Sequence, residues 1–483
     1  MTRGYKSYLD LILLLTLAVG LRFFSFFQSV IDHDESTYIV IARDLFDGSD
    51  LYTDITDTKP IGIFIIFGLI LKLAGNSIFW FRFIVSLLIG ITGYWLYCFQ
   101  LNRIKSRKAA LASGILYVFF VSTWRSYGIS CNTELFFTFF NALALFLLFQ
   151  SGKWYYIALS GFLFGISFII KYSAVFDFAA IMLFYYVNRV CQKETWRSIF
   201  IDVLITLIFF LIPFGLVHLY FWLNGNFDDF LFATYKVAGN YRSDVSYTKL
   251  FRGFIDVMVL LLPIWIFFYT MLIKRNQIVD RGYKILILVW FVFVCLSIIQ
   301  LGNNFAHYYL QFALPVSLLG GVFFHEKINT IPVVKYFTSG WTSKVILGVL
   351  IFIIIFSAKK EYFDKPDYPK AIANYLNRKL SPGDQIYTGN SYQIIYFLTN
   401  KKSPTPYVHS TMLFQPRLLK IMGIDQQEEF SKIFKQYPGY VLKKIDERPR
   451  WDLSVFDAFL TKYHYKLDTI FEGRSVVKVY THE

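Results

Sequence analysis

Residues Ile31 to Tyr38 read Ile-Asp-His-Asp-Glu-Ser-Thr-Tyr, and the loop that they open ends at Asp57 to Pro60 with Asp-Thr-Lys-Pro. Acidic residues are concentrated between these points, at Asp32, Asp34, Glu35, Asp44, Asp47, Asp50, Asp54 and Asp57. The segments on both sides of this loop are strongly apolar. A loop this polar between apolar segments indicates a site at one face of a membrane, and we expect it to be an active-site loop.

The composition is that of a protein with many membrane-spanning segments. Of the 483 residues, 56% are hydrophobic and 17% are charged, whereas soluble domains carry about 25% charged residues. The net charge of +15 could indicate a nucleic-acid partner. We exclude that class because the basic residues fall in short loops between apolar segments, where they set topology and contact anionic lipids. The four cysteines have neither paired nor metal-ligand spacing, and we expect small buried residues there.

About 11 apolar segments are candidates for membrane-spanning helices. They are residues 8–28, 77–100, 109–124, 131–150, 154–170, 173–187, 199–223, 253–273, 284–301, 308–324 and 344–358. The basic loops between them predict which side is cytoplasmic, and these loops are 101–108, 188–198, 274–284 and 325–344. Loop 101–108 is cytoplasmic only if residues 60–74 do not fully cross, so we expect a juxtamembrane or re-entrant piece there. No small-residue cleavage site follows the first apolar run, which predicts a retained first helix and no signal peptide.

This topology predicts a plasma (inner) membrane protein whose polar features share the outer face. These features are loop 29–60, Glu134, Lys171, loop 224–252, His307 and the C-terminal residues. From Lys359 onward no run is long enough to span. Helices are expected at Asp367–Lys379 and Trp451–Tyr463, and strands at Gln385–Thr388, Tyr440–Leu442 and Ser475–Tyr480. We therefore predict a transmembrane domain at residues 1–358 and a small extracytoplasmic α/β domain at residues 359–483.

Apolar residues recur at helical spacing after Asp34 and Glu35 as far as Gly48. This pattern predicts a short amphipathic helix on the membrane surface. Asp34 would then be either the N-cap of that helix or a catalytic carboxylate held at fixed depth. Four consecutive ionisable residues, Asp32 to Glu35, favour the catalytic interpretation because such groups are costly at membrane depth.

Three further charged residues stand beside apolar runs, and each has two interpretations. Lys59 either extends to the lipid headgroups or binds an anion. Glu134 either complements a helix dipole or takes part in chemistry. Lys171 interrupts an apolar run and is either a turn anchor or a cation directed at a phosphate.

His307 and Tyr308 precede another apolar run, where an aromatic belt is one interpretation and substrate contact is another. His33 could likewise contact substrate. Asp32, His33 and Asp34 could bind a divalent metal together with Glu134 or His307, although no spacing enforces it.

The pattern Asp34-Glu35-x-x-Tyr38, with Asp57-Thr-Lys59-Pro60 further on, resembles the first outer loop of GT-C glycosyltransferases. The most similar type is the protein O-mannosyltransferase and lipid A aminoarabinose transferase group. The resemblance covers roughly residues 8–325 and continues through Ala42-Arg43, Gly48, Gly75, Phe81-Arg82, Glu134, Lys171 and His307-Tyr308 before Pro315. Two positions depart from the family pattern: Ile61 follows Pro60 where a second proline is usual, and Glu134 stands where Asp is frequent.

The resemblance implies an inverting transfer of a sugar from a polyprenyl-phosphate carrier to a lipid, glycan or protein acceptor at the outer face. Lys59 and Lys171 would bind the donor phosphate, and Asp34 would be the general base. Glu35 and Glu134 would orient the acceptor or the base. No glycine-rich nucleotide-binding loop is present in the sequence, in keeping with a lipid-linked donor.

Two other classes of function stay open at this point. A transporter or flippase of lipid-linked saccharides would use the same charges for binding alone. Its usual signs are similar halves and broken helices near the midplane, and neither is visible in the sequence. A scaffold protein with a partner-binding tail would leave the acidic loop unexplained.

Overall fold

A computed structural model describes residues 2–123, 128–150, 153–240, 248, 251–255, 281–302, 305–325, 340–445, 451–473 and 475–482. The chain divides into two compact units. The first comprises Met1–Phe26, Phe79–Leu219 and Arg242–Asp364, and the second comprises Phe27–Ile78, Tyr220–Tyr241 and Lys365–Glu483. The first outer loop thus belongs to the same unit as the C-terminal residues. The predicted boundary between residues 358 and 359 stays a prediction.

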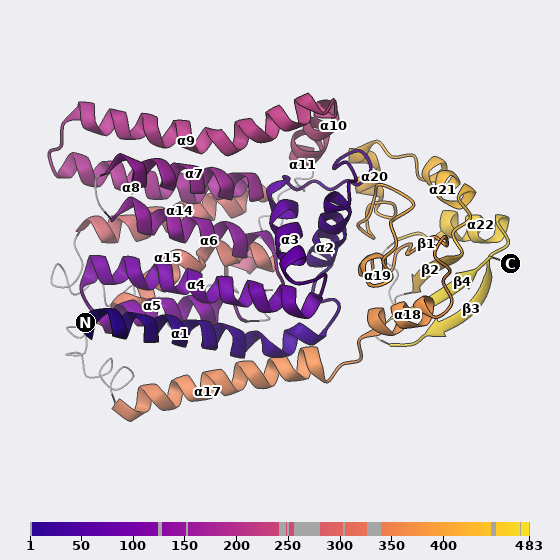
Figure 1. Cartoon of the computed structure of the whole chain (residues 1–483), viewed down its shortest axis with the longest axis horizontal. Helices are drawn as coiled ribbons and strands as arrows, with labels where there is room; N and C mark the ends of the chain where they lie inside the picture. Colours follow the sequence, from indigo (N-terminus) through magenta and orange to yellow (C-terminus); the bar gives the residue numbers. More distant parts are fainter. Residues whose placement is uncertain are drawn as a thin grey trace. The chain divides into compact units, whose positions relative to one another are not determined.

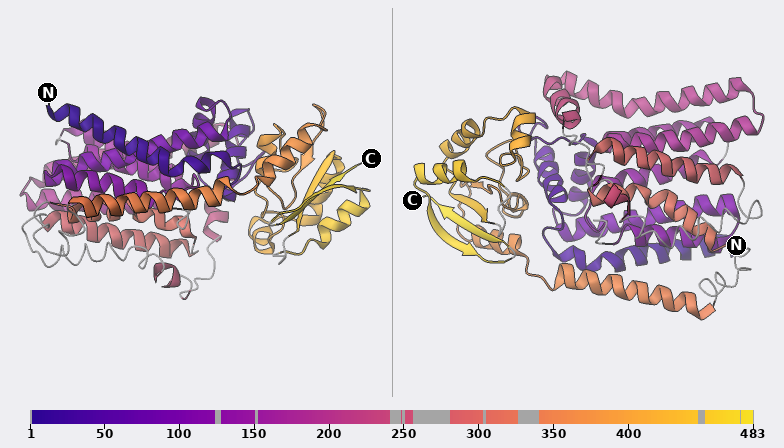
Figure 2. Two further views of the ribbon diagram at one scale, coloured as in Figure 1. Left: turned by 90° about the horizontal axis from the view of Figure 1, so that it is seen from below. Right: turned by 180° about the vertical axis from the view of Figure 1, so that it is seen from behind.

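The first unit is a bundle of long apolar helices that lie side by side (Figures 1 and 2). Its long helices are α1 Thr2–Arg22, α4 Ile78–Ile104, α5 Arg107–Phe120, α6 Thr133–Leu148, α7 Trp154–Ile170, α8 Val175–Cys191, α9 Trp196–Leu223, α14 Arg281–Leu301, α15 Ala313–Phe323 and α17 Gly340–Ala358. Short 3-10 helices adjoin some of them, namely η1 Phe23–Phe27, η2 Tyr172–Ala174 and η4 Ala306–Phe312, and the π-helix η6 Lys359–Phe363 follows α17. Each predicted span therefore coincides with a helix, except 253–273, which lies largely outside the described residues.

Five apolar segments in the described part of the chain are long enough to cross a membrane. They are Ser7–Phe27, Ile78–Ile104, Tyr172–Cys191, Trp196–Leu223 and Gly340–Asn377. Other apolar helices, including α6 and α7, are shorter than a full span. The chain is a membrane protein with several apolar helices, while the number of spans and their orientation stay predictions.

Small residues let neighbouring helices of the bundle approach closely. A Cβ atom on Gly321 of α15 would lie 2.7 Å from the carbonyl oxygen of Ala109 in α5, and one on Gly114 of α5 would lie 2.8 Å from the carbonyl oxygen of Gly93 in α4. Such contacts are typical of helix packing in lipid, where van der Waals contact replaces the hydrophobic effect. They keep α15 buried along its whole length.

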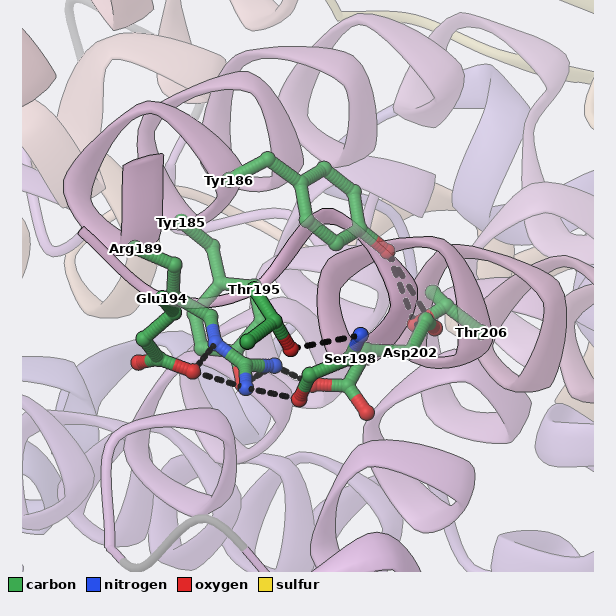
Figure 3. A network of polar contacts seen from close by, with 8 residues as sticks. All are labelled: Tyr185, Tyr186, Arg189, Glu194, Thr195, Ser198, Asp202 and Thr206. Atoms are coloured by element: carbon green, nitrogen blue, oxygen red, sulfur yellow. Dashed lines mark hydrogen bonds and ion pairs between the residues drawn. The ribbon is translucent and has the colours of Figure 1, made fainter. Parts of the chain in front are cut away.

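A polar network ties the end of α8 to the start of α9 (Figure 3). Arg189 of α8 forms ion pairs with Glu194 and Asp202 and donates a hydrogen bond to Ser198 Oγ at 2.9 Å. The Tyr186 hydroxyl of α8 also lies 3.1 Å from Thr206 Oγ1 of α9. The network fixes the turn in the predicted cytoplasmic loop 188–198.

The second unit begins with two short helices, α2 His33–Phe46 and α3 Gly62–Leu73. Helix α3 is about 18 Å long at 1.5 Å per residue, too short to cross a hydrocarbon core of about 30 Å. Helix α2 exists as predicted, but the expected amphipathic surface helix is wrong, because every residue from Glu35 to Asp44 is buried. Helix α3 and the C-terminal helix α19 Ile394–Leu398 both pack on α2.

Part of the predicted loop 224–252 is helical in the structure. It contains α10 Phe227–Leu231, the π-helix η3 Phe232–Val237 and α11 Ala238–Asn240. Phe230 stacks on Phe221 with ring centroids 4.5 Å apart, and Val237 packs with Met412, Leu418 and Met422 of the C-terminal residues. Apolar residues at helical spacing explain why this segment is ordered.

The C-terminal residues form a four-stranded sheet in the order β1-β2-β4-β3. The strands are β1 Ile386–Tyr387, β2 Tyr440–Ile445, β3 Lys466–Phe471 and β4 Val476–Thr481. β1 pairs in parallel with β2, and the β2–β4 and β3–β4 pairs are antiparallel. The accompanying helices are α18 Tyr368–Asn377, α19, α20 Pro416–Met422, α21 Gln426–Lys435 and α22 Ser454–Lys462. A small C-terminal sheet with accompanying helices is present as predicted, although α19 to α21 and β3 had not been predicted.

Aromatic rings from α21 and α22 form the core of this sheet domain. Phe430, Phe434 and Phe456 are fully buried with Tyr387 of β1. Gly389 follows β1 with φ of +52°, and a Cβ there would lie 2.3 Å from the Leu442 carbonyl oxygen. Glycine is therefore required at this close approach, in the turn that leads from β1 into α19.

Candidate active site

Helix α2 begins one residue before Asp34. Its N-cap is Asp32, whose side chain makes no capping hydrogen bond, and Asp34 lies within the first turn. The N-cap interpretation of Asp34 is therefore wrong. A carboxylate in the first helical turn is favoured by the helix dipole, and its oxygens face other side chains.

The Asp34 carboxylate faces a histidine from the C-terminal residues. His409 Nε2 lies 3.6 Å from Asp34 Oδ1, and the Tyr38 hydroxyl, one helical turn further on, lies 3.5 Å from Asp34 Oδ2. Asp34 is 28% exposed, so a reactant can reach it. Glu35, its neighbour, is buried.

His33 is fixed against α19 and the turn that precedes it. Its Nδ1 lies 3.3 Å from Gln393 Oε1, while Gln393 Nε2 donates to the His33 carbonyl oxygen at 2.8 Å and to Thr37 Oγ1 at 2.8 Å. The imidazole is stacked parallel to the Tyr392 ring. Burial, aided by the charges of His409 and Lys444, lowers the pKa of His33 to about 4. His33 is therefore a neutral ring at ordinary pH.

The backbone of Lys59 is held by two groups in the same loop. Its N–H donates to Asp57 Oδ1 at 2.9 Å, and its carbonyl oxygen accepts from the Tyr52 hydroxyl at 2.8 Å. Asp57 is buried, and Lys59 is half-buried. The loop residue Thr56 also donates its N–H to the Pro406 carbonyl oxygen at 2.9 Å. Lys59 thus has a defined place in the same unit as Asp34.

In the helical bundle, Lys171 and Glu134 form a buried ion pair. Glu134 lies in the first turn of α6, and Lys171 interrupts the helix at the end of α7 with an extended backbone. Thr133 Oγ1 donates to Glu134 Oε2 at 3.0 Å. Both side chains are more than nine-tenths buried, so the two charges offset each other's desolvation.

The ring of Tyr308 completes this cluster. Lys171 Nζ lies 4.2 Å from its centroid, a cation–π distance. His307, the preceding residue, is within electrostatic reach of Glu134 and is stacked on Phe305. Three chain segments therefore converge at one charged cluster of Glu134, Lys171, His307 and Tyr308.

A buried hydrogen-bond network centred on Asp177 involves residues that closely follow Lys171 and Tyr308 in the sequence. Asp177 Oδ1 accepts from Trp290 Nε1 at 2.5 Å, and Oδ2 accepts from Gln311 Nε2 at 2.6 Å. Gln311 also contacts the Ser173 carbonyl oxygen at 3.3 Å and accepts from Ser297 Oγ at 2.9 Å. Because Ser173 follows Lys171 closely and Gln311 follows Tyr308, the network fixes the two segments that carry the cation and the ring.

The acidic loop does not form a metal site with the other predicted ligands. The described residues contain no group of three or more His, Cys, Asp or Glu side chains placed to hold a metal ion. His409 is held on its other nitrogen by Thr411, and Glu134 is paired with Lys171. These described residues therefore do not fit a metal centre.

Comparison with known proteins adds evidence on the fold. Residues 58–218 match the family model described as dolichyl-phosphate-mannose-protein mannosyltransferase. The solved structure of ArnT from Cupriavidus metallidurans bound to undecaprenyl phosphate superposes with a TM-score of 0.63 at 13% identity, covering 97% of each chain. Its apo state gives 0.62 at 14% identity, again over 97% of each chain. The chain has the fold of a GT-C glycosyltransferase.

Other comparisons are weaker. AglB from Archaeoglobus fulgidus, in complex with an inhibitory peptide and a dolichol-phosphate, matches with a TM-score of 0.47 at 12% identity, over 91% of this chain and 69% of that chain. That likeness is too low to support an argument. No curated protein sequence matches the chain.

Within the GT-C fold, the predicted site residues fall into two groups. His33, Asp34, Glu35 and Lys59 belong to the second unit, whereas Glu134, Lys171, His307 and Tyr308 belong to the first. The structure brings the members of the latter group together, and their roles stay predictions.

Two further sets of residues near the candidate site are not among those predicted from the sequence. One is Asp177, and the other is His409 with Gln393. Asp177 could have been found, because it is a lone acid in an apolar segment and such groups are costly. His409 and Gln393 carried no comparable signal, because they lie in polar loops more than 350 positions from their partners in α2. Only tertiary structure reveals them.

Proposed function

We propose that the protein is a membrane glycosyltransferase that moves a sugar from a polyprenyl-phosphate donor to an acceptor at the outer face of the membrane. The observation that carries the proposal is the convergence of Lys171, Glu134 and Tyr308 in a chain with the ArnT fold. The ArnT structure in question contains undecaprenyl phosphate, which supports a lipid phosphate as the leaving group.

Lys171 is suited to bind the donor phosphate. An ammonium group has three N–H donors, so it can contact Glu134 and a phosphate oxygen at the same time. As the bond to the anomeric carbon breaks, negative charge grows on the phosphate oxygens, and a cation already in place stabilises that charge without reorganisation. Lys59 is proposed as the second cation.

Asp34 is proposed as the general base. The acceptor oxygen attacks the anomeric carbon and transfers its proton to Asp34, while the bond between that carbon and the phosphate oxygen breaks and the phosphate leaves with the electron pair. A single displacement inverts the anomeric configuration and needs no covalent enzyme intermediate. Glu35 and Glu134 would orient the acceptor or the base, and His33, His307 and Tyr308 are candidate substrate contacts.

The test is transfer of labelled sugar from a polyprenyl-phosphate donor in membranes that contain the protein. Asp34→Asn should abolish transfer, because the amide cannot take a proton, while membrane insertion and cooperative unfolding are retained. Asp50→Asn is the matched control, since Asp50 is an exposed acid of the same loop, and it should keep full activity. Near-normal transfer by Asp34→Asn would overturn the assignment of the base.

The same preparation separates the enzyme from a transporter. A flippase would move lipid-linked sugar across vesicles without consuming it. Release of free polyprenyl phosphate together with a glycosylated acceptor supports the transferase, and movement without release overturns it.

A further inference from the structure

We infer that His409, which comes from the C-terminal residues, is a positioning residue for the Asp34 carboxylate. The inference rests on the proposed function, because it assigns a role in the same site. It also implies that the site is incomplete without the C-terminal residues.

The hydrogen bonds of the His409 ring determine which of its two nitrogens carries the proton. Its Nδ1 accepts a hydrogen bond from the Thr411 backbone N–H at 3.2 Å, and the Thr411 hydroxyl lies 2.8 Å from the same nitrogen. A backbone N–H can only donate, so Nδ1 of the neutral ring carries no proton. The proton is therefore on Nε2, the nitrogen that faces Asp34.

Each oxygen of the Asp34 carboxylate faces a side chain that can donate a hydrogen bond. Asp34 Oδ1 faces His409 Nε2 at 3.6 Å, and Oδ2 faces the Tyr38 hydroxyl at 3.5 Å. Both contacts are longer than a hydrogen bond of normal length, as is common in unliganded sites whose contacts tighten when substrate binds. Two N–H or O–H donors, one on each oxygen, would hold the carboxylate in one orientation and stabilise its ionised form.

Other titratable side chains lie close to His409 and Asp34. The rings of His33 and His409 lie 6.3 Å apart, and Lys444 of β2 lies over the Tyr392 ring on which His33 is stacked. Among the described residues, the titratable groups near the pair include His33 and Tyr38 from α2, Tyr392, and Lys444 from β2. With His33 neutral and fixed by Gln393, the N–H of His409 is the donor aimed at Oδ1.

The experiment compares His409→Ala with His409→Gln, because glutamine retains an N–H donor at about the same reach. In the alanine variant, kcat should fall about tenfold or more, the cost of a hydrogen bond to a charged group, with KM for the lipid donor unchanged. The acid limb of the kcat/KM profile should move to higher pH, because an ionised Asp34 loses a donor. The glutamine variant should restore most of the rate and the original limb.

His482→Ala is the matched control, since His482 contacts Tyr437 and Tyr465 in the same domain and should leave rate and limb unchanged. Thermal midpoints of Asp34→Asn, His409→Ala and the double variant give a readout that needs no activity. The double variant should lose less than the sum of the single losses.

These arms separate the two hypotheses. Coupled midpoints with no sugar transfer by the wild-type protein would overturn the proposed function and leave the contact standing. Additive midpoints, or an alanine variant with an unmoved acid limb, would overturn the role of His409.

Discussion

Lys171 and Glu134, 37 positions apart in the chain, form a buried ion pair between the ends of α7 and α6. The pair has a cost, because two charges removed from water lose hydration that their attraction only partly restores. Apolar residues of similar size would avoid that cost. The presence of the pair is therefore better explained by a requirement for a fixed cation than by stability.

Lys171→Met should lower sugar transfer by about 100-fold or more, because a preorganised charge at the leaving group is lost. The variant also leaves Glu134 buried without its cation, which should cost about 3–5 kcal/mol of unfolding free energy. Transfer assays and thermal melting in detergent measure the two effects. Lys153→Met, which removes an exposed lysine at the start of α7, should change neither.

The variant Glu134→Gln/Lys171→Met tests whether the two effects have different origins. It should recover much of the lost stability, because no unpaired charge remains, yet it should stay inactive. Recovery of transfer in this double variant would contradict the assignment of Lys171 to the phosphate.

Asp177→Ala should destabilise the bundle by about 2–3 kcal/mol. The substitution leaves the donors of Trp290 and Gln311 buried without their acceptor, and each unsatisfied group costs about 1–3 kcal/mol. Asp177→Asn retains an acceptor oxygen and should lose less. Thermal midpoints provide the comparison. An alanine variant as stable as the wild type would show that the network does not contribute to the stability of the bundle.

Stability should depend on His33 at mildly acidic pH. The pKa of His33 is lowered to about 4 in the folded protein, chiefly by burial, from about 6.5 in the unfolded chain. The unfolded state then binds more protons between these values, so stability is complete above pH 6.5 and falls as the pH drops toward 4. The thermal midpoint measured from pH 7.5 to pH 4 should decline over this window.

His33→Phe keeps a flat ring against Tyr392 and removes the titration. Its thermal midpoint should decline less between pH 6.5 and pH 4 than that of the wild type. An identical decline in both proteins would assign the effect to another group.

Gly321→Ala should destabilise the protein by about 1–3 kcal/mol, the usual cost of overpacking. The added Cβ would meet the Ala109 carbonyl oxygen and the Ser113 side chain of α5, so α15 and α5 must separate. Gly348→Ala in α17 is the matched control, because nothing lies within 4 Å of its Cβ position. Equal midpoints for the two variants would contradict the close packing of α5 and α15.

The helices of the bundle could be predicted from the sequence, because a long apolar run is an unambiguous pattern. Long apolar runs predicted helices at α4, α6, α7 and α9 with nearly correct limits, whereas α1 begins and ends six residues earlier than predicted. The nature of α2 could not be predicted in the same way. Its polar residues indicated a solvent-facing side, but α3 and α19 cover both sides of the helix, and a sequence pattern does not show which distant segment provides the cover.

Some residues of the candidate site could be predicted from the sequence, and others could not. Glu134, Lys171 and Tyr308 were selected because charges and rings at the ends of apolar runs are conspicuous, and the structure brings them together. His409 could not be selected, because a histidine in a polar loop has no distinguishing pattern. The strand β3 was missed for a related reason: its exposed lysine and leucine lack the alternation of a buried strand, and a bulge interrupts its register at Leu467 and Thr469.

Helix α2 is buried by α19, although α19 is synthesised long afterwards. Residue 78 leaves the ribosome about 15–60 s before residue 365 at ordinary translation rates. During that interval, Tyr38, Ile39, Val40 and Ile41, all but fully buried in the finished unit, lack part of their cover. We therefore expect a chain truncated before α19 to be inserted but degraded faster than the full chain, because these apolar residues of α2 stay partly uncovered.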